Sequence, residues 1–530
     1  MPSLDDVFQV SRDVIDNAIS KLKNDKSDGD KGLWFNLVIN TPSSWRDILG
    51  CLISSMITHG HHAEELLLST LTSLPKNNLG DVCDSNNYRG ISLASCVNKV
   101  IDWVILLQYR DILCTSDLQF AYKQHHSTAM CTLALKEVSK YYIARRGQVF
   151  CCLLDASKAF DRVRYDKLFN VLLERKLPAA IVRFLIDQYS RQKVRTVWEG
   201  FHSDTFETSN GVRQGGVLSP ILFTVYIDVL LQRLENSGLG CYVGHEYFGG
   251  LCSADDLSLL APNLWCLKRM LEICEKFGHE YGIIFNALKT VCILINGRRQ
   301  PGRDLPVLTL NGINIKWETS VKHLGNIVSH DLSEEVEIQR KRCDFIGRTN
   351  SLIANFKSVQ KPVLSKVFMA KCCHFYGSQT WDLDSRYINT FSTTWRKAVR
   401  KIWCLPYRTR SSIVPHLLGV QPFEEQLHQR VAKMYNNVRK GHNAKMLLLL
   451  RTSMDTQKMG IMGINSQVIS RKWLCGWDHL QNNNDVRGDA DIIPRVDAIK
   501  ELVACRDGDG DIPGFTRNDA ATLANHIACY

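Results

Sequence analysis

The first part of the chain carries apolar residues at a helical spacing. Between Val7 and Leu22 they recur every three or four positions, which matches the 3.6-residue period of an amphipathic helix. A second stretch, from Trp45 to Ile57, has the same pattern. We therefore expect residues 1–74 to form a helical N-terminal extension, followed by a loop that runs from Leu74 to Gly80.

The next segment, residues 75–298, alternates short apolar runs with amphipathic helices. Strands are predicted over residues 149–154, 194–199, 206–210 and 290–295, and helices over residues 165–176, 219–236 and 264–281. Ser219 and Pro220 predict an N-cap followed by proline at the first helical position. Residues 252–260 predict a tight hairpin. This order of elements indicates an α+β fold, not the strict βαβ repeat of a Rossmann fold.

Beyond residue 298 the pattern changes again. Residues 298–303 are rich in arginine and predict a break between two parts of the chain. After Asp331 the sequence becomes helical and strongly basic up to about residue 411. Residues 412–530 predict a C-terminal helical region, with a polar interruption at 481–491, whose role the sequence does not indicate.

Composition adds two constraints. The 530 residues are 45% hydrophobic and 22% charged, which is ordinary for a globular protein with a large core. The net charge of +11 suits a polyanionic partner, because each neutralised phosphate releases condensed counterions.

The 19 cysteines form no C-x-x-C pair, which argues against a disulfide scaffold or a zinc ribbon. With no leader and no membrane-length apolar run, we expect an intracellular protein with no membrane partner.

Three carboxylates stand at the ends of short apolar runs. Asp155 follows Cys-Leu-Leu, and Asp255 and Asp256 lie between Leu-Cys-Ser-Ala and Leu-Ser-Leu-Leu. An Asp-Asp pair by itself also fits a solvated turn. Unpaired charges are costly beside apolar strands, however, and Mg²⁺ prefers hard oxygen ligands. If the two strands converge, they can hold a pair of Mg²⁺ ions that stabilise in-line attack on a phosphate.

Several strings surround these carboxylates in a fixed order. They are Pro-Lys at 75–76, Asn-Tyr-Arg-Gly-Ile-Ser-Leu at 87–93, Gln-Phe-Ala-Tyr at 119–122, Asp-Ala-Ser-Lys-Ala-Phe-Asp at 155–161, Asn-Gly-Val-Arg-Gln-Gly-Gly-Val-Leu-Ser-Pro at 210–220, Phe-Asn-Ala-Leu-Lys-Thr at 285–290 and Val-Lys-His-Leu-Gly at 321–325. From about residue 7 to residue 420, this order resembles the reverse transcriptases of non-LTR (LINE-type) retrotransposons. The resemblance implies a right-hand polymerase, with fingers and palm at 75–298 and a primer-grip hairpin and helical thumb at 299–411.

The resemblance also implies the catalytic set. Asp155, Asp255 and Asp256 would be the ligands of two Mg²⁺ ions, which Mn²⁺ can replace. Lys289 would be a general acid for pyrophosphate or an added cation, although a strand-edge lysine has the same pattern. Gly325 would lie in the primer-grip hairpin.

The nucleotide-binding residues follow in the same way. Lys76 and Arg89 would contact the triphosphate, where cations neutralise the charge that develops as pyrophosphate leaves. Phe160 would be the aromatic gate that excludes a 2′-hydroxyl, although a core aromatic has the same pattern. Further substrate contacts are implied for the backbone at Ala156 and for Gln214 and Gly215.

Two positions depart from the family pattern. The family usually has proline where Gly90 stands, and we expect the glycine to loosen a turn there. It has tyrosine or phenylalanine where Ser253 stands, an aromatic residue that lies against the primer end. Base–aromatic contacts contribute roughly 1–3 kcal/mol each, so Ser253 predicts reduced but not absent activity.

A basic helix after the hairpin predicts a nucleic-acid contact. Trp395, Val399, Ile402 and Trp403 share one helical face, and Arg396, Lys397, Arg400 and Lys401 share the other. A solvated amphipathic helix has the same pattern. We expect this thumb to bind the phosphates of a template–primer duplex.

The predicted activity is RNA-directed DNA synthesis from deoxynucleoside triphosphates, with an RNA template and a DNA primer, in the nucleus. The family usually carries an endonuclease, for which we find no convincing pattern here. One alternative is a weakened remnant that only binds nucleic acid. Another is a two-metal nuclease, which fits the aspartates but not the nucleotide-binding motifs.

Overall fold

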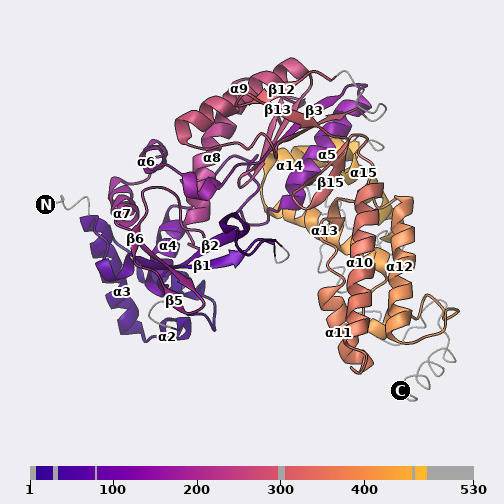
Figure 1. Ribbon diagram of the computed structural model, residues 1–530, viewed down its shortest axis with the longest axis horizontal. Helices are drawn as coiled ribbons and strands as arrows, with labels where there is room; N and C mark the ends of the chain where they lie inside the picture. Colours follow the sequence, from indigo (N-terminus) through magenta and orange to yellow (C-terminus); the bar gives the residue numbers. More distant parts are fainter. Residues whose placement is uncertain (1–7, 28–33, 78–79, 297–304, 456–459, 474–530) are drawn as a thin grey trace, which may run out of the picture.

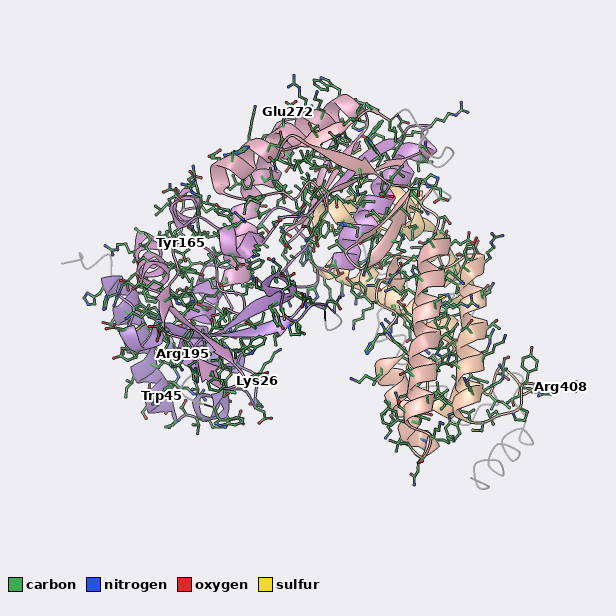
Figure 2. All side chains as sticks on the ribbon, viewed as in Figure 1. Lys26, Trp45, Tyr165, Arg195, Glu272 and Arg408 are labelled. Atoms are coloured by element: carbon green, nitrogen blue, oxygen red, sulfur yellow. The ribbon has the colours of Figure 1, made fainter. Side chains whose placement is uncertain are left out.

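The protein consists of two lobes joined by a central sheet (Figure 1). The computed structural model describes residues 8–27, 34–77, 80–296, 305–455 and 460–473. The break expected at 298–303 and the chain after residue 473 lie outside these ranges. Figure 2 marks the N-terminal lobe by Trp45, Tyr165 and Arg195, and the far end of the other lobe by Arg408.

The central sheet has six strands in the order β12-β13-β11-β3-β10-β9. In that order the strands are Leu308–Leu310, Ile313–Trp317, Val291–Ile295, Val149–Leu154, Asp256–Ala261 and Gly250–Ser253. β3 lies between β11 and β10 and pairs antiparallel with both. All six residues of β3 are buried, as expected for an uninterrupted apolar run in the middle of a sheet. The expected strand at 149–154 and hairpin at 252–260 are confirmed.

A second sheet of five strands lies in the N-terminal lobe. Its strands are β1 (Leu68–Pro75), β2 (Tyr88–Leu93), β4 (Lys193–Trp198), β5 (Phe201–His202) and β6 (Phe206–Glu207). The helical expectation is wrong over 68–74, because β1 pairs antiparallel with β2 and parallel with β4, a strand far away in sequence. The strand expected at 206–210 covers only 206–207.

Helices cover both sheets. The N-terminal lobe contains α1 (Arg12–Ser20), α2 (Phe35–Ile39), α3 (Ser43–His59), α4 (Cys96–Gln108), α6 (Tyr165–Glu174) and α7 (Ala179–Ser190). Three helices pack against the central sheet, namely α5 (Thr128–Ala144), α8 (Ser219–Asn236) and α9 (Leu264–Tyr281). The bounds of α8 and α9 match the expected helices.

The expected N-cap of α8 is wrong. Ser219 is already helical, and the N-cap residue is Leu218, whose apolar side chain cannot accept a hydrogen bond. The buried carboxylate of Asp102 accepts hydrogen bonds from the backbone N–H groups of Val217 (3.1 Å) and Leu218 (3.2 Å) instead. A residue of α4 therefore satisfies donors at the start of α8 that no local residue reaches.

The second lobe is helical, as expected. A two-stranded hairpin, β14 (Ser320–His323) and β15 (Asn326–Ser329), leads into α10 (Glu335–Asn355), α11 (Lys361–Lys371) and α12 (Arg386–Ile402). Three further helices follow, α13 (Phe423–Lys440), α14 (Ala444–Asp455) and α15 (Ile461–Trp473). Figure 1 shows α10, α11 and α12 projecting away from the central sheet, opposite the N-terminal lobe.

A buried ion pair joins α5 to the start of this helical lobe. Lys136 Nζ lies 3.0 Å from Glu334 Oε1, and the two side chains are only 4% and 6% exposed. The other carboxylate oxygen of Glu334 accepts a hydrogen bond from Asp382 N at 2.6 Å. Lys136 also donates to the carbonyl of Thr380. Each of the two charged groups thus has more than one polar partner.

Within the described ranges, every helix is too short or too polar to span a lipid bilayer. The α+β fold class expected from the sequence is confirmed by the two sheets and the helices that cover them.

Replacing Lys136 with methionine should strand the Glu334 carboxylate in the interior. We expect the free energy of unfolding to fall by about 3–5 kcal/mol, the usual cost of breaking a buried pair. Adding Glu334→Gln should recover part of this loss, because it removes the unpaired charge. Urea denaturation of the single and double variants measures both values, and equal stability of Lys136→Met and the unmodified protein would contradict the expectation.

Candidate active site

The three predicted carboxylates meet at one edge of the central sheet. Leu154 pairs with Leu257, so Asp155, just after β3, lies opposite Asp256, the first residue of β10. Asp255 belongs to the two-residue turn that precedes Asp256, since Ser253 pairs with Asp256 across the hairpin. The sheet register alone therefore brings Asp155 to the two neighbouring aspartates.

Negative charge at this edge is unfavourable, as the pKa shifts of two carboxyls indicate. Burial raises the pKa of Asp255, and the charge of Asp155 adds to this effect while Arg89 opposes it. Burial together with the charges of Asp255 and Asp155 raises the pKa of Asp256 to about 6. A cation bound between the carboxylates would relieve both the burial cost and the repulsion.

The ligand chemistry suits a hard divalent cation, since all three side chains offer carboxylate oxygens. Among the described residues, however, no group of three His, Cys, Asp or Glu side chains is close enough to hold an ion. The three aspartates thus share one electrostatic site without forming a closed coordination shell.

A segment after α9 runs along the backbone of Asp155 and fixes it from the other side. Asn286 N donates to the carbonyl of Asp155 at 2.8 Å, and Ser157 N donates to the carbonyl of Ile284 at 2.9 Å. Ala156 forms an isolated bridge with Phe285. The same segment brings Lys289 Nζ to 3.8 Å from Asp155 Oδ2, with the lysine side chain 68% exposed. Lys289 is therefore a cation at the carboxylates that remains open to solvent.

The turn that carries Asp255 is held by a glutamine. Ala254 has a φ of +62°, in the left-handed region that an alanine rarely adopts. Gln119 Oε1 accepts hydrogen bonds from Ala254 N and Ala121 N, both at 3.0 Å. Gln119 belongs to the string at 119–122, but its spacing did not reveal this link to the turn.

The glycine-rich string 210–220 lies against the second sheet. Gly215 has a φ of +120°, and a Cβ there would lie 2.5 Å from the carbonyl oxygen of Ser92, so only glycine fits. The neighbouring Gln214 accepts a backbone hydrogen bond from Ser92 at 2.6 Å. Its side-chain amide donates to Asp161 Oδ1 at 3.1 Å. The loop thus connects the second sheet with the segment after Asp155.

Phe160 is half-buried and stacked. Its ring lies 4.3 Å from the ring of Phe223 in α8, centroid to centroid, with an interplanar angle of 18°. The carbonyl of Phe160 accepts a hydrogen bond from Val212 N at 2.9 Å. The aromatic ring is therefore held in one orientation near Asp155.

The two cations expected at the triphosphate lie on the β1–β2 hairpin. Arg89 is exposed, and its charge partly opposes the rise that burial causes in the pKa of Asp255. Lys76 Nζ donates to the carbonyl of Asn86 at 3.0 Å, within the loop between the two strands. The expectation of a loosened turn at Gly90 is wrong, because Gly90 lies in β2 and pairs with Ser73.

Ser253 is 4% exposed at the end of β9. It lies opposite Asp256 in the hairpin, so it borders the carboxylates as the sequence implied. The small hydroxyl fills this position without an aromatic surface.

The β14–β15 hairpin is attached to β10, the strand that begins at Asp256. His323 Nε2 lies 2.9 Å from Ser258 Oγ, and Ser258 is in β10, two residues after Asp256. Both turn residues, Leu324 and Gly325, have positive φ, and a Cβ on Gly325 would lie 2.7 Å from Tyr376 Cε1. Tyr376 donates to the carbonyl of Leu324 at 3.1 Å. His323 belongs to the string at 321–325, but the sequence did not indicate the partners of His323 or Tyr376, because only the folded chain brings these residues together.

The basic helix corresponds to α12, and its apolar face is buried as expected at Trp395, Val399 and Ile402. Its cations differ in their surroundings. Arg396 lies 3.6 Å from Glu424, and Arg400 donates to the carbonyl of Thr409 at 2.8 Å. Lys397 and Lys401 are exposed, and Lys401 donates to Asn350 at 2.9 Å. The two arginines thus help to fix the lobe, whereas Lys397 and Lys401 are the two cations of the helix that remain exposed.

His323 makes the stability of the hairpin dependent on pH. Burial lowers the pKa of His323 to about 4, below the ordinary value of 6.5. Between these two pH values the histidine is protonated in the unfolded chain but neutral in the folded protein. The free energy of unfolding therefore decreases as the pH falls from 6.5 to 4. We expect His323→Gln to reduce this acid loss by up to about 3 kcal/mol. Chemical denaturation at several pH values measures it, with the exposed His245→Gln as the control. Identical pH profiles for the two variants would refute this role.

Comparison with known proteins agrees with this geometry. Residues 74–347, just over half of the chain, match the family model described as reverse transcriptase (RNA-dependent DNA polymerase). The chain is 28% identical over 247 residues to the Retrovirus-related Pol polyprotein from type-1 retrotransposable element R2 of Nasonia vitripennis, covering 46% of this chain and 24% of that protein.

Two further relatives match over longer stretches. The RNA-directed DNA polymerase from mobile element jockey of Drosophila melanogaster is 22% identical over 446 residues, covering 80% of this chain and 47% of the relative. The Retrovirus-related Pol polyprotein from type-1 retrotransposable element R1 of Bradysia coprophila is 23% identical over 393 residues, covering 70% and 37%. The chain thus spans between a quarter and a half of the length of these relatives. It belongs to the reverse transcriptase (RNA-dependent DNA polymerase) family, in the branch found in non-LTR, LINE-type retrotransposable elements.

Proposed function

We propose that this chain is an RNA-directed DNA polymerase that adds deoxynucleotides to the 3′ end of a DNA primer. The observation that carries the proposal is the β3–β10 register, which sets Asp155 beside Asp255 and Asp256 at the end of the sheet. Arg89 on the β1–β2 hairpin is near enough to Asp255 for the two charges to interact, so a triphosphate bound between them would have a cation on one side and the carboxylates, with any ions they hold, on the other.

Asp155, Asp255 and Asp256 are the residues that would hold the Mg²⁺ ions, for which Mn²⁺ can substitute. When bound, such ions supply Lewis-acid stabilisation of the entering and leaving oxygens in phosphoryl transfer. The chain's own groups do the rest. Lys289, 3.8 Å from Asp155, supplies a positive charge near the pyrophosphate, and Arg89 and Lys76 orient the triphosphate.

Selection of the nucleotide is assigned to two adjacent features. Phe160, fixed by its stack on Phe223, lies under the sugar and leaves no room for a 2′-hydroxyl. Gln214 and Gly215 bring backbone and amide groups against the base pair, where Gly215 has no side chain to block the approach. The hairpin around Gly325 and the exposed face of α12 then support the primer–template duplex. Action in the nucleus is part of the same proposal.

Two alternatives fit part of the site. Ser253 in place of an aromatic residue favours a weakened remnant that binds nucleic acid without extending it. The carboxylates alone also fit a two-metal nuclease, but Arg89, Phe160 and Gly215 have no role in that reaction.

Primer extension on an RNA template with Mg²⁺ and deoxynucleoside triphosphates tests the proposal. We expect extension by the unmodified chain and a loss of at least about a hundredfold in Asp255→Ala, since a metal ligand contributes several kcal/mol to transition-state stabilisation. Asp204→Ala, at an exposed aspartate, should keep full activity. Binding without extension would favour the remnant, and cleavage of labelled nucleic acid without added nucleotides would favour the nuclease.

Removal of the Phe160 ring should relax the choice of sugar. We expect Phe160→Ala to incorporate ribonucleotides more readily relative to deoxynucleotides, by up to about a hundredfold, the range in which a shaped apolar pocket rejects a hydroxyl. Phe206→Ala removes an exposed aromatic ring from the second sheet and serves as the control. Competition between labelled nucleotides in the primer-extension assay gives the ratio, and an unchanged ratio in Phe160→Ala would exclude Phe160 as the gate.

A further inference from the structure

A polar cleft lies between the start of α5 and one face of α13, in a part of the chain to which the proposed chemistry assigns no role. Its volume is about 560 Å³. Its lining is dominated by amide and cationic side chains: Gln379, Gln426, Gln429, Arg430, Lys433 and Asn437. Ser127 and two methionines complete it, and none of the described residues that line it carries a carboxylate.

The spacing on α13 explains why these side chains share one face. Positions 426, 430, 433 and 437 follow each other at intervals of three or four, and position 429 is three residues after 426, so the five form one stripe along the helix. The opposite face, with Leu427, Val431 and Val438, is buried. The helix therefore packs through its apolar face, and its polar stripe lines the cleft.

The two cations differ in exposure and in their contacts. Arg430 is half-buried, its guanidinium lies 5.5 Å from the centroid of the Phe375 ring, and it donates to the carbonyl of Cys373 at 3.4 Å. A guanidinium has five N–H donors, and within the described residues this carbonyl is the one hydrogen-bond acceptor that Arg430 meets. Lys433 is exposed and forms no ion pair within the same residues. The cleft thus contains one positive charge held by contacts, on Arg430, and one exposed positive charge, on Lys433.

The cleft is connected to the active site through Tyr376. Thr128, next to Ser127 at the start of α5, lies 2.5 Å from the Tyr376 hydroxyl, oxygen to oxygen. The same hydroxyl donates to the carbonyl of Leu324 in the hairpin turn, and that hairpin is joined to β10 by His323 and Ser258. These hydrogen bonds link the start of α5, at one end of the cleft, to the β14–β15 hairpin and through it to β10.

We propose that this cleft binds a single-stranded segment of the nucleic acid on which the enzyme acts, with the RNA template as the favoured strand. Arg430 and Lys433 would bind phosphates, and the amides offer both donors and acceptors to base edges and to 2′-hydroxyls. An acidic peptide would use the two cations but not the row of amides. The inference rests on the proposed function, and it gives α13 a role in holding the template.

The salt dependence of binding tests the proposal directly. Fluorescence anisotropy of the whole chain with a single-stranded RNA oligonucleotide gives the dissociation constant at several salt concentrations. We expect Lys433→Ala to weaken binding and to reduce the slope of log K against log salt by about 0.7, the value for one phosphate contact on a single strand. Lys440→Ala, an exposed lysine at the end of the same helix and outside the cleft, is the matched control.

The amides and the choice of strand are tested with a second variant. Gln426→Ala combined with Gln429→Ala should weaken RNA binding with no change in the salt slope, and should weaken binding of a DNA oligonucleotide of the same sequence less. Thermal melting of each variant checks that the fold is intact. Equal dissociation constants and slopes for Lys433→Ala, Lys440→Ala and the unmodified chain would overturn the proposal.

Photo-crosslinking separates this inference from the polymerase proposal. A template RNA carrying 4-thiouridine in its single-stranded part, annealed to a DNA primer, should crosslink to residues 426–437 in both the unmodified chain and Asp255→Ala. Crosslinks at α13 in an unmodified chain that does not extend the primer would support the cleft while refuting the polymerase. Extension with no crosslink at α13 would refute the cleft alone.

Discussion

The site depends on one strand pairing. β3 is buried between β11 and β10, and its register with β10 sets Leu154 against Leu257. A shift of one residue would turn every side chain of β3 to the opposite face of the sheet, and the close packing of these buried side chains of different sizes opposes that exchange. The position of Asp155 is therefore fixed by the burial of its neighbours, although the resulting crowding of three carboxylates is itself unfavourable. β10 also carries Ser258, so the same strand fixes the turn with Asp255 and the β14–β15 hairpin that follows the sheet.

Elements with a strong local pattern could be predicted from the sequence. The strand at 149–154 and the helices at 219–236 and 264–281 have the expected bounds, because their apolar spacing matches their burial. β1 was missed because its stability comes from pairing with β4, more than a hundred residues later, and not from its own sequence. The cap of α8 was assigned to Ser219 for the same reason, since Asp102 reaches the helix start from another element.

The candidate site shows the same division. The carboxylates, the glycine-rich loop and Phe160 were identified from motifs, because a short string of unusual residues can be recognised without knowledge of the fold. Gln119 beneath the Ala254 turn and Tyr376 beside Gly325 act through contacts between distant segments, and no spacing indicates such contacts. On α12 the sequence pattern predicted four equivalent cations, but in the fold Arg396 lies near Glu424 and Arg400 donates to the Thr409 carbonyl.

The last helix of the described ranges, α15, completes the interior of much earlier segments. Glu137, a buried carboxyl of α5, accepts a hydrogen bond at 2.8 Å from the backbone of Met462, a separation of 325 residues. Asn465 likewise bonds to the carbonyl of Trp381 and to Leu383 N. At about 5–20 residues per second, a ribosome needs roughly 16–65 s to make the intervening chain. During that interval the nascent protein holds a partly built core with an unmatched acidic group, so chaperones have a defined period in which to engage it before the final turn of the fold closes.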